Sequence, residues 1–239
     1  MIPKIIHRIW IQGYDAIDDS LKVELDNCVK INNDFTHYVW DESHILKLLE
    51  SFNPSYINMY HGYEQYAQKA DLARYVILYV FGGVYLDMDM VCFKNLKTLL
   101  HHPVFVTKPP LVKSIQNCVI GIVPNHILME IALRLCVERI DDKSILRSTG
   151  PAMLYDAIKE YGDVEIIERK YLYPCLPHDP EWCSYVCDSC YVSHIAHASW
   201  HKRTSKPVRD YLRNNQLAIV SSIVAVMYVL VIGSTLKDT

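Results

Sequence analysis

The chain has 239 residues, and 51% of them are hydrophobic. This length and composition fit one folded domain with a complete core and one appended segment. The formal net charge of −3 argues against general binding of polyanions, so nucleic acid is not expected as a partner.

Short apolar runs alternate with amphipathic stretches along most of the chain. The apolar runs predict β-strands at residues 4–10, 36–40, 84–88, 104–107, 117–123 and 164–167. The amphipathic stretches predict helices at residues 18–31, 41–51, 56–66, 68–81, 125–139 and 152–161. This alternation is typical of an α/β domain with a mainly parallel central sheet.

The segment 70–91, ADLARYVILYVFGGVYLDMDMV, contains the main candidate site. Asp71 and Arg74 lie three residues apart on the predicted helix and share one face. Because that helix is apolar, we expect the pair to be buried beside a polar partner, with a surface ion pair as the alternative. Asp87 and Asp89 end the predicted strand, where side chains two apart point the same way and can hold one divalent cation. The segment predicts a metal-dependent enzyme that acts on a diphosphate.

Other side chains are candidates for the same site. Ile9 and Trp10 end the first predicted strand, where an aromatic ring can stack on a nucleobase, although core packing is the alternative for Trp10. Tyr85 lies on the same side of its strand as the first of the two aspartates. His194 or His197 can complete a metal site with a neutral ring nitrogen, unless both are ordinary loop histidines.

The end of the chain differs from the rest, because residues 214–236 contain no charged side chain. As a helix this run would span about 34 Å, against about 30 Å of bilayer hydrocarbon. We expect a transmembrane anchor at residues 217–236 after a basic connector at residues 204–216; a buried C-terminal helix is the alternative. The basic residues before the run and the lack of an apolar signal peptide predict a single-pass membrane protein with a cytosolic catalytic domain.

Eight cysteines are present, and disulfides are not expected in a cytosolic domain. Cys175, Cys183, Cys187 and Cys190 crowd together and have the ligand type of a structural zinc site. Free thiols or a local disulfide are the alternatives. If the domain were luminal, disulfides would be the first interpretation.

Four blocks in this order resemble glycosyltransferase family 32. They are IPKIIHRIW at residues 2–10, AD-x-x-R followed by GG-x-Y-L-D-x-D, the Thr-Gly-Pro at residues 149–151, and YVSHIAHASW at residues 191–200. The family comprises Och1-like and mannosyl-inositolphosphoceramide synthase-like sugar transferases with a DXD motif. The clostridial glucosylating toxins are distant relatives. The resemblance covers residues 1–203.

The resemblance implies a GT-A-like nucleotide-sugar-binding domain at residues 1–203, with Mn²⁺ or Mg²⁺ as cofactor. It implies that Asp71 holds hydroxyls of the donor sugar and that Arg74 steadies sugar or phosphate. It also implies that Asp87 contacts the donor ribose and that Asp89 binds the metal directly. His194 aligns with the family's histidine and is favoured over His197 as third ligand.

For the remaining candidates, the resemblance implies contacts of Ser199 and Trp200 with the donor diphosphate and of Asn117 with the donor sugar. The implied activity is transfer of a hexose from a GDP- or UDP-hexose to a glycan, glycolipid or protein acceptor. Retention of the anomeric configuration is expected, as in a mannosyl- or glucosyltransferase.

Two other classes of protein remain as alternatives. One is a non-catalytic membrane protein that binds a sugar or nucleotide on a transferase scaffold. The other is a haloacid-dehalogenase-type phosphohydrolase, which also uses an Asp-x-Asp at a strand end. In that class the motif continues differently from Met90-Val91, and it usually lies near the N-terminus.

Overall fold

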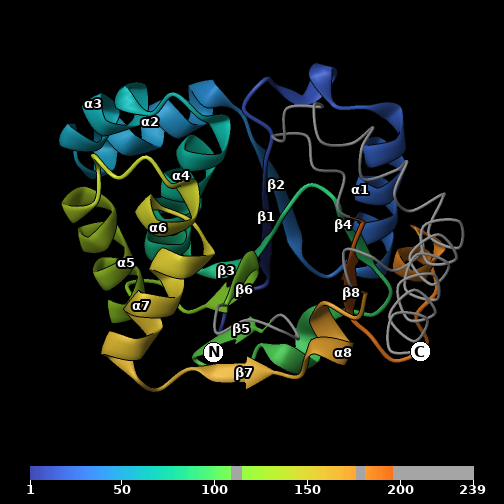
Figure 1. The fold of residues 1–239 in the computed structure, drawn as a ribbon. Helices are drawn as coiled ribbons and strands as arrows, with labels where there is room; N and C mark the ends of the chain where they lie inside the picture. The colour runs from blue at the N-terminus through green and yellow to red at the C-terminus, as the bar shows by residue number, and fades with distance from the viewer. Residues whose placement is uncertain (109–114, 176–180, 196–239) are drawn as a thin grey trace, which may run out of the picture. The chain divides into compact units, whose positions relative to one another are not determined.

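The computed structural model describes residues 1–108, 115–175 and 181–195. A six-stranded sheet with the order β2-β1-β3-β6-β5-β7 forms its centre (Figure 1). The strands are β1 (Ile5–Ile9), β2 (Thr36–Trp40), β3 (Gly83–Leu86), β5 (Val104–Thr107), β6 (Gln116–Ile122) and β7 (Glu165–Ile167). Only β6 runs antiparallel to its neighbours within this sheet, so the predicted α/β domain with a mainly parallel sheet is confirmed.

Helices cover both faces of the sheet. They are α1 (Asp19–Ile31), α2 (Glu42–Phe52), α3 (Ser55–Gly62), α4 (Tyr66–Phe81), α5 (Ile127–Glu138), α6 (Ile145–Ser148), α7 (Pro151–Tyr161) and α8 (Arg169–Leu172). Short 3₁₀ helices lie at η1 (Tyr14–Ala16), η2 (Leu96–Leu99) and η3 (Glu181–Tyr185). Figure 1 shows α2 to α7 gathered on one side, and α1 and α8 on the other.

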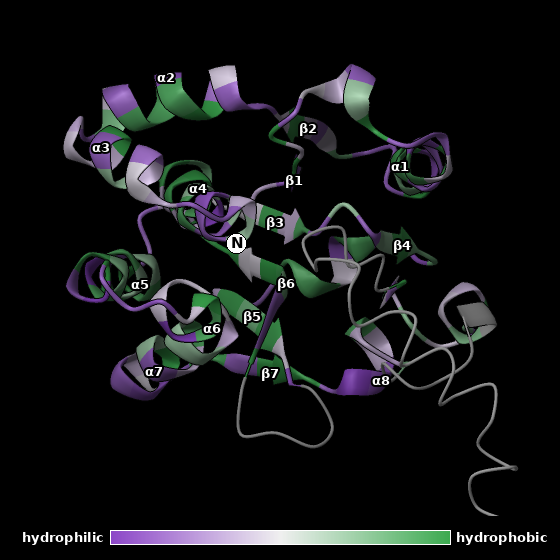
Figure 2. Cartoon of the chain, turned by 45° about the horizontal axis from the view of Figure 1, so that its top comes forward, coloured by the Kyte–Doolittle hydropathy of each residue, from purple (hydrophilic) through white to green (hydrophobic). Residues whose placement is uncertain are grey.

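Two apolar cores follow from this arrangement. The larger core packs α2, α3, α4, α5 and α7 against one face of the sheet. The second core lies on the opposite face, where Leu86 and Phe105 meet residues of η2, α8 and a small second sheet. Figure 2 shows the central strands β3, β5 and β6 as largely hydrophobic, as strands covered on both faces must be.

The connection from α4 to β3 depends on two glycines with positive φ, +61° at Gly82 and +95° at Gly83. A Cβ on Gly82 would lie 2.6 Å from the backbone nitrogen of Pro124, and one on Gly83 would lie 2.7 Å from the carbonyl of Ile5. Only glycine fits both the backbone conformation and the space. The pair therefore ends α4 and directs β3 into the sheet, as the sequence predicted.

One local prediction was wrong. The strand β3 ends at Leu86, and Asp87 opens a turn in which the Met90 N–H donates to the Asp87 carbonyl at 3.1 Å. Asp87 and Asp89 therefore do not lie two apart on a strand. After the turn, β4 (Met90–Cys92) pairs antiparallel with β8 (Val192–His194), and Met90 lies opposite His194.

The prediction of a zinc site was also wrong, whereas the alternative of a local disulfide among the same four cysteines is confirmed. Disulfides join Cys28 to Cys92, Cys175 to Cys183, and Cys187 to Cys190, while Cys118 and Cys136 are buried free thiols. The four cysteines considered as zinc ligands are thus oxidised in pairs and cannot act as thiolate ligands. The expectation of a domain without disulfides fails for the same reason.

The predicted connector at 204–216 and anchor at 217–236 lie outside the described residues. Among the residues that are described, no helix combines the length and apolar character needed to cross a membrane. The anchor stays a prediction.

Candidate active site

The ion pair predicted on α4 is buried. Asp71 is 4% exposed and Arg74 is 6% exposed, and the Arg74 Nη2 lies 3.1 Å from the Asp71 Oδ1. The alternative of a surface ion pair is therefore wrong. A buried charged pair is costly unless further hydrogen bonds satisfy it, so its other partners define the site.

Arg74 joins α4 to the turn after β3. Its Nη1 lies 3.1 Å from the Asp87 Oδ1 and donates to the carbonyl of Asn117 at 2.6 Å. The guanidinium carbon lies 4.4 Å from the centre of the Tyr85 ring, a cation–π contact. The Tyr85 hydroxyl donates to the same Asp87 oxygen at 2.8 Å, which confirms that the two side chains lie on one side.

Asp71 is held through both carboxylate oxygens. The Asn117 side-chain amide donates to Oδ1 at 2.9 Å, and the Thr149 hydroxyl donates to Oδ2 at 2.9 Å. Burial raises the pKa of Asp71 to about 7, although Arg74 and Thr149 act in the opposite direction. Burial alone would lower the pKa of Arg74, but Tyr85, Asp87 and Asp71 outweigh burial and raise it, so the guanidinium stays charged.

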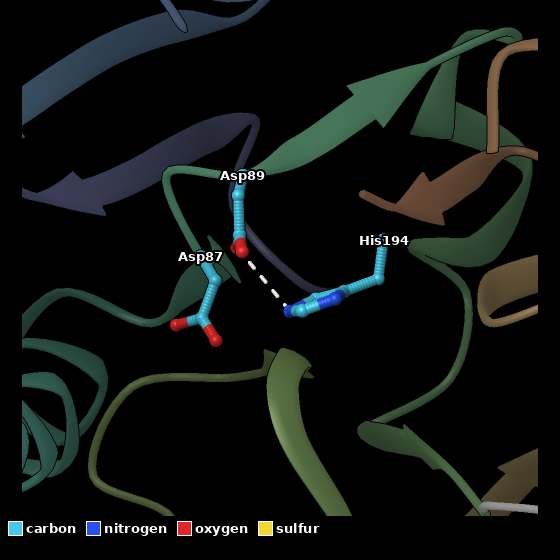
Figure 3. Close-up of side chains that lie close together, drawn as sticks. All are labelled: Asp87, Asp89 and His194. Carbon is cyan, nitrogen blue, oxygen red and sulfur yellow. Dashed lines mark ion pairs between the residues drawn. The ribbon is translucent and has the colours of Figure 1, made fainter. Parts of the chain in front are cut away.

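The second part of the site consists of Asp87, Asp89 and His194, which come from the turn after β3 and from β8 (Figure 3). Each offers one ligand atom, and these atoms lie within 4.8 Å of one another. The His194 Nε2 lies 3.2 Å from the Asp89 Oδ1. Burial lowers the pKa of His194, but the hydrogen bond and charge of Asp89, with the charge of Asp87, raise it overall.

The backbone fixes this arrangement. The Ile195 N–H donates to the Asp89 carbonyl at 3.0 Å, and the Ser184 hydroxyl donates to the His194 carbonyl at 2.9 Å. The Tyr173 ring lies 5.4 Å from the imidazole of His194. Two carboxylates and one imidazole on a partly exposed site form a donor set suited to a divalent cation such as Mn²⁺.

Ile9 and Trp10 lie at the end of β1, as predicted, but they face different neighbours. Ile9 packs in the larger core. Trp10 is half-buried against a small apolar cluster that includes Met88, the residue between the two aspartates. Core packing, the alternative considered for Trp10, therefore explains part of this side chain.

Three of the predicted site residues, Ser199, Trp200 and the reserve ligand His197, lie outside the described residues. The described site contains Asp71, Arg74, Tyr85, Asp87, Asp89, Asn117 and His194.

Sequence reasoning missed three side chains that support the site: Arg8, Thr149 and Tyr173. Thr149 was noted only within the Thr-Gly-Pro block of the resemblance, and Tyr173 had no distinguishing pattern. Arg8 did carry a signal, because a charged residue inside an apolar strand needs a buried partner. The identity of that partner could not be read from the sequence.

Two solved glycosyltransferases show the same fold. The glycosyltransferase PaToxG matches with a TM-score of 0.54 and 22% identity, covering 67% of this chain and 70% of its own. The galactosyltransferase LgtC, solved with donor and acceptor sugar analogues, matches with a TM-score of 0.51 and 14% identity, covering 83% and 90%. These two matches show that the chain has a GT-A-like α/β fold.

Sequence comparison identifies the family. The profile described as the glycosyltransferase sugar-binding region containing a DXD motif matches residues 18–106. A glycosyltransferase of Acanthamoeba polyphaga mimivirus is 41% identical over 211 residues, which is 84% of each chain. A mannosyl phosphorylinositol ceramide synthase of Saccharomyces cerevisiae is 30% identical over 185 residues, covering 72% of this chain and 47% of that enzyme. The chain belongs to this family of DXD-containing glycosyltransferases, and it spans about half the length of the yeast relatives that it matches.

Proposed function

We propose that the protein transfers a hexose from a nucleotide sugar with the help of a divalent cation held by Asp87, Asp89 and His194. The observation that carries the proposal is the convergence of these three ligand atoms within 4.8 Å, beside the buried Arg74. An imidazole beside two carboxylates favours Mn²⁺ over Mg²⁺. A bound ion would neutralise negative charge on the departing nucleoside diphosphate.

The remaining side chains orient the donor. Arg74 lies 3.1 Å from Asp87 and can turn its planar guanidinium toward the phosphate or sugar of the donor. Asp71, held by Asn117 and Thr149, would accept hydrogen bonds from sugar hydroxyls of the donor. The base would stack on Trp10 beside Ile9, and Ser199 and Trp200 would reach the diphosphate.

The reaction is proposed to retain the anomeric configuration. The bond from the anomeric carbon to the diphosphate oxygen breaks, and a bond to the acceptor hydroxyl oxygen forms on the same face. The acceptor proton passes to the departing phosphate oxygen. Asp71 and Asp87 are both held by Arg74, which fits electrostatic roles better than attack on the sugar.

Mannose is the proposed sugar and a glycolipid the proposed acceptor. The support is the similarity to mannosyl phosphorylinositol ceramide synthase and to an inositol phosphoceramide mannosyltransferase of Schizosaccharomyces pombe, which is 29% identical over 174 residues. An anchor at residues 217–236 would keep the enzyme at a bilayer, where such an acceptor lies. Glucose as the sugar and a glycan or protein as the acceptor are the competing outcomes.

The test is donor hydrolysis by the purified full chain with a panel of UDP- and GDP-sugars. We expect Mn²⁺-dependent release of sugar from one donor, most rapidly from GDP-mannose, and loss of release with EDTA. Asp89→Ala should lower the rate at least about 100-fold. The matched control is Asp163→Ala, which removes an exposed aspartate between α7 and β7.

Each outcome has a defined meaning. Release that survives EDTA and Asp89→Ala would overturn the metal site. Tight nucleotide binding without turnover, with acceptor present, would favour a non-catalytic binding protein. Nuclear magnetic resonance of the first sugar released assigns its anomer, and an inverted anomer would overturn the retaining mechanism.

A further inference from the structure

A buried arginine lies beneath the turn that carries both aspartates. Arg8 belongs to the middle strand of the parallel trio β2-β1-β3 and is 1% exposed. Its Nη1 donates to the carbonyls of Asp87 and Met88, each at 3.0 Å, and its Nη2 donates to the carbonyl of Met90 at 2.9 Å. One guanidinium therefore binds three carbonyl oxygens within four consecutive residues.

Those carbonyls lie where the regular sheet ends. The pairing of β3 with its neighbours stops at Leu86, and the next residues leave the sheet to form the turn. Met88 and Met90 are buried, and a buried carbonyl without a hydrogen bond costs free energy. The fixed fork of a guanidinium can satisfy several carbonyls at once, whereas an ammonium group presents its donors from one point.

Arg8 also places a positive charge beneath two carboxylates. Burial lowers the pKa of Arg8 to about 10, against the opposing effect of Tyr85, Asp89 and Asp87, so the guanidinium is charged at neutral pH. The same strand continues into Trp10, two residues further on. The strand proposed to hold the nucleobase is thus hydrogen-bonded directly to the backbone of the proposed metal-binding turn.

We propose that Arg8 is a positioning residue, which holds the turn Asp87–Met90 in the conformation that directs both carboxylates toward His194. The effect on metal binding rests on the proposed function. The effect on the turn does not, because it concerns backbone hydrogen bonds of the protein alone.

The first experiment is amide hydrogen exchange of the full chain without metal, for wild type, Arg8→Lys and Arg8→Met. The Met90 N–H donates to the Asp87 carbonyl and the Asp87 N–H donates to the Cys118 carbonyl, so both amides report on the turn. We expect exchange in residues 87–90 to rise at least about 10-fold in Arg8→Met and by less in Arg8→Lys, while β6 stays protected. Arg139→Met is the matched control, because Arg139 is half-buried and binds the Arg147 carbonyl of α6 and the Asp156 carboxylate of α7 rather than the turn.

The second experiment measures Mn²⁺ affinity by calorimetry on the same proteins, with Asp89→Ala as the variant without a site. We expect Arg8→Lys and Arg8→Met to bind Mn²⁺ about 10- to 100-fold more weakly than wild type, the usual effect of removing support behind a metal ligand. Arg139→Met should bind like wild type.

The two experiments separate failure of this inference from failure of the proposed function. Unchanged exchange at residues 87–90 in both Arg8 variants would overturn the positioning role, whatever the metal does. If wild type and Asp89→Ala bind Mn²⁺ equally, the metal site fails, and the exchange result alone decides on Arg8. If Arg8→Met does not fold, Arg8→Lys decides, and wild-type exchange together with wild-type affinity in that variant would overturn the proposal.

Discussion

Arg74 contacts four other residues of the described site. It pairs with Asp71 on its own helix and with Asp87 in the turn, and it donates to the carbonyl of Asn117 on β6. It also lies over the ring of Tyr85. A lysine at this position would keep the charge but could not make the two ion pairs, the carbonyl contact and the ring contact together.

We therefore expect Arg74→Lys to lower kcat/KM for donor hydrolysis about 100-fold while the fold is kept. The control is Arg134→Lys, which changes an exposed arginine paired with Glu138 and Glu160. Steady-state kinetics with Mn²⁺ measure the effect, and circular dichroism checks the fold. An Arg74→Lys enzyme within a factor of two of wild type would show that positive charge alone is sufficient.

The junction between α4 and β3 shows how elements are connected. His7, on β1, shares a hydrogen bond of 3.0 Å between its Nε2 and the Gly82 carbonyl, and its Nδ1 accepts from the Trp40 indole N–H at 3.1 Å. Both contacts can be made only by the neutral ring with its proton on Nε2. Burial lowers the pKa of His7 from 6.5 to about 4, despite the opposing hydrogen bond to Gly82.

This shift predicts a pH-dependent stability. Between pH 6.5 and pH 4 the unfolded chain binds a proton at His7 and the folded chain does not, so the free energy of unfolding falls as the pH falls. The contribution is fully present above pH 6.5 and amounts to about 2 kcal/mol between pH 7 and pH 5. Urea unfolding at these two pH values should show a smaller difference in His7→Gln than in wild type. The exposed His61, replaced in His61→Gln, provides the control, and an equal difference in His7→Gln would refute the prediction.

Elements with a local cause could be predicted from the sequence. The strand β1, the helix α4 and the glycine pair between α4 and β3 all follow from apolar periodicity and from residues that only one conformation accommodates. The turn at Asp87–Met90 could not be predicted, because its carbonyls accept hydrogen bonds from Arg8. Arg8 precedes Asp87 by 79 residues in the sequence. The bond between Cys28 and Cys92, 64 residues apart, was missed for the same reason. Site contacts within one element, such as the Asp71–Arg74 pair, were predictable, and the contacts of Arg8 and Thr149 with distant segments were not.

The cysteine chemistry of the whole molecule bears on where the enzyme works. Basic residues before the uncharged C-terminal run predict a cytosolic domain, whereas disulfides persist mainly in oxidising compartments. Six of the eight cysteines are paired in the structure, and the two others are buried. The Cys28–Cys92 bond joins α1 to β4, the strand that directly follows the turn carrying Asp89. We infer that the catalytic domain folds in an oxidising environment.

Counting thiols in the full chain tests this inference. When cells of the native host are lysed directly into denaturant that contains maleimide, the protein should take up two equivalents of maleimide per chain. A separate sample that is denatured and reduced before maleimide is added should take up eight, because every cysteine is then available. Cys136→Ala should lower the unreduced count to one, since Cys136 is one of the two free thiols. Eight equivalents before reduction would mean that the cysteines are reduced where the enzyme works, and would restore the cytosolic location that the flanking charges predict.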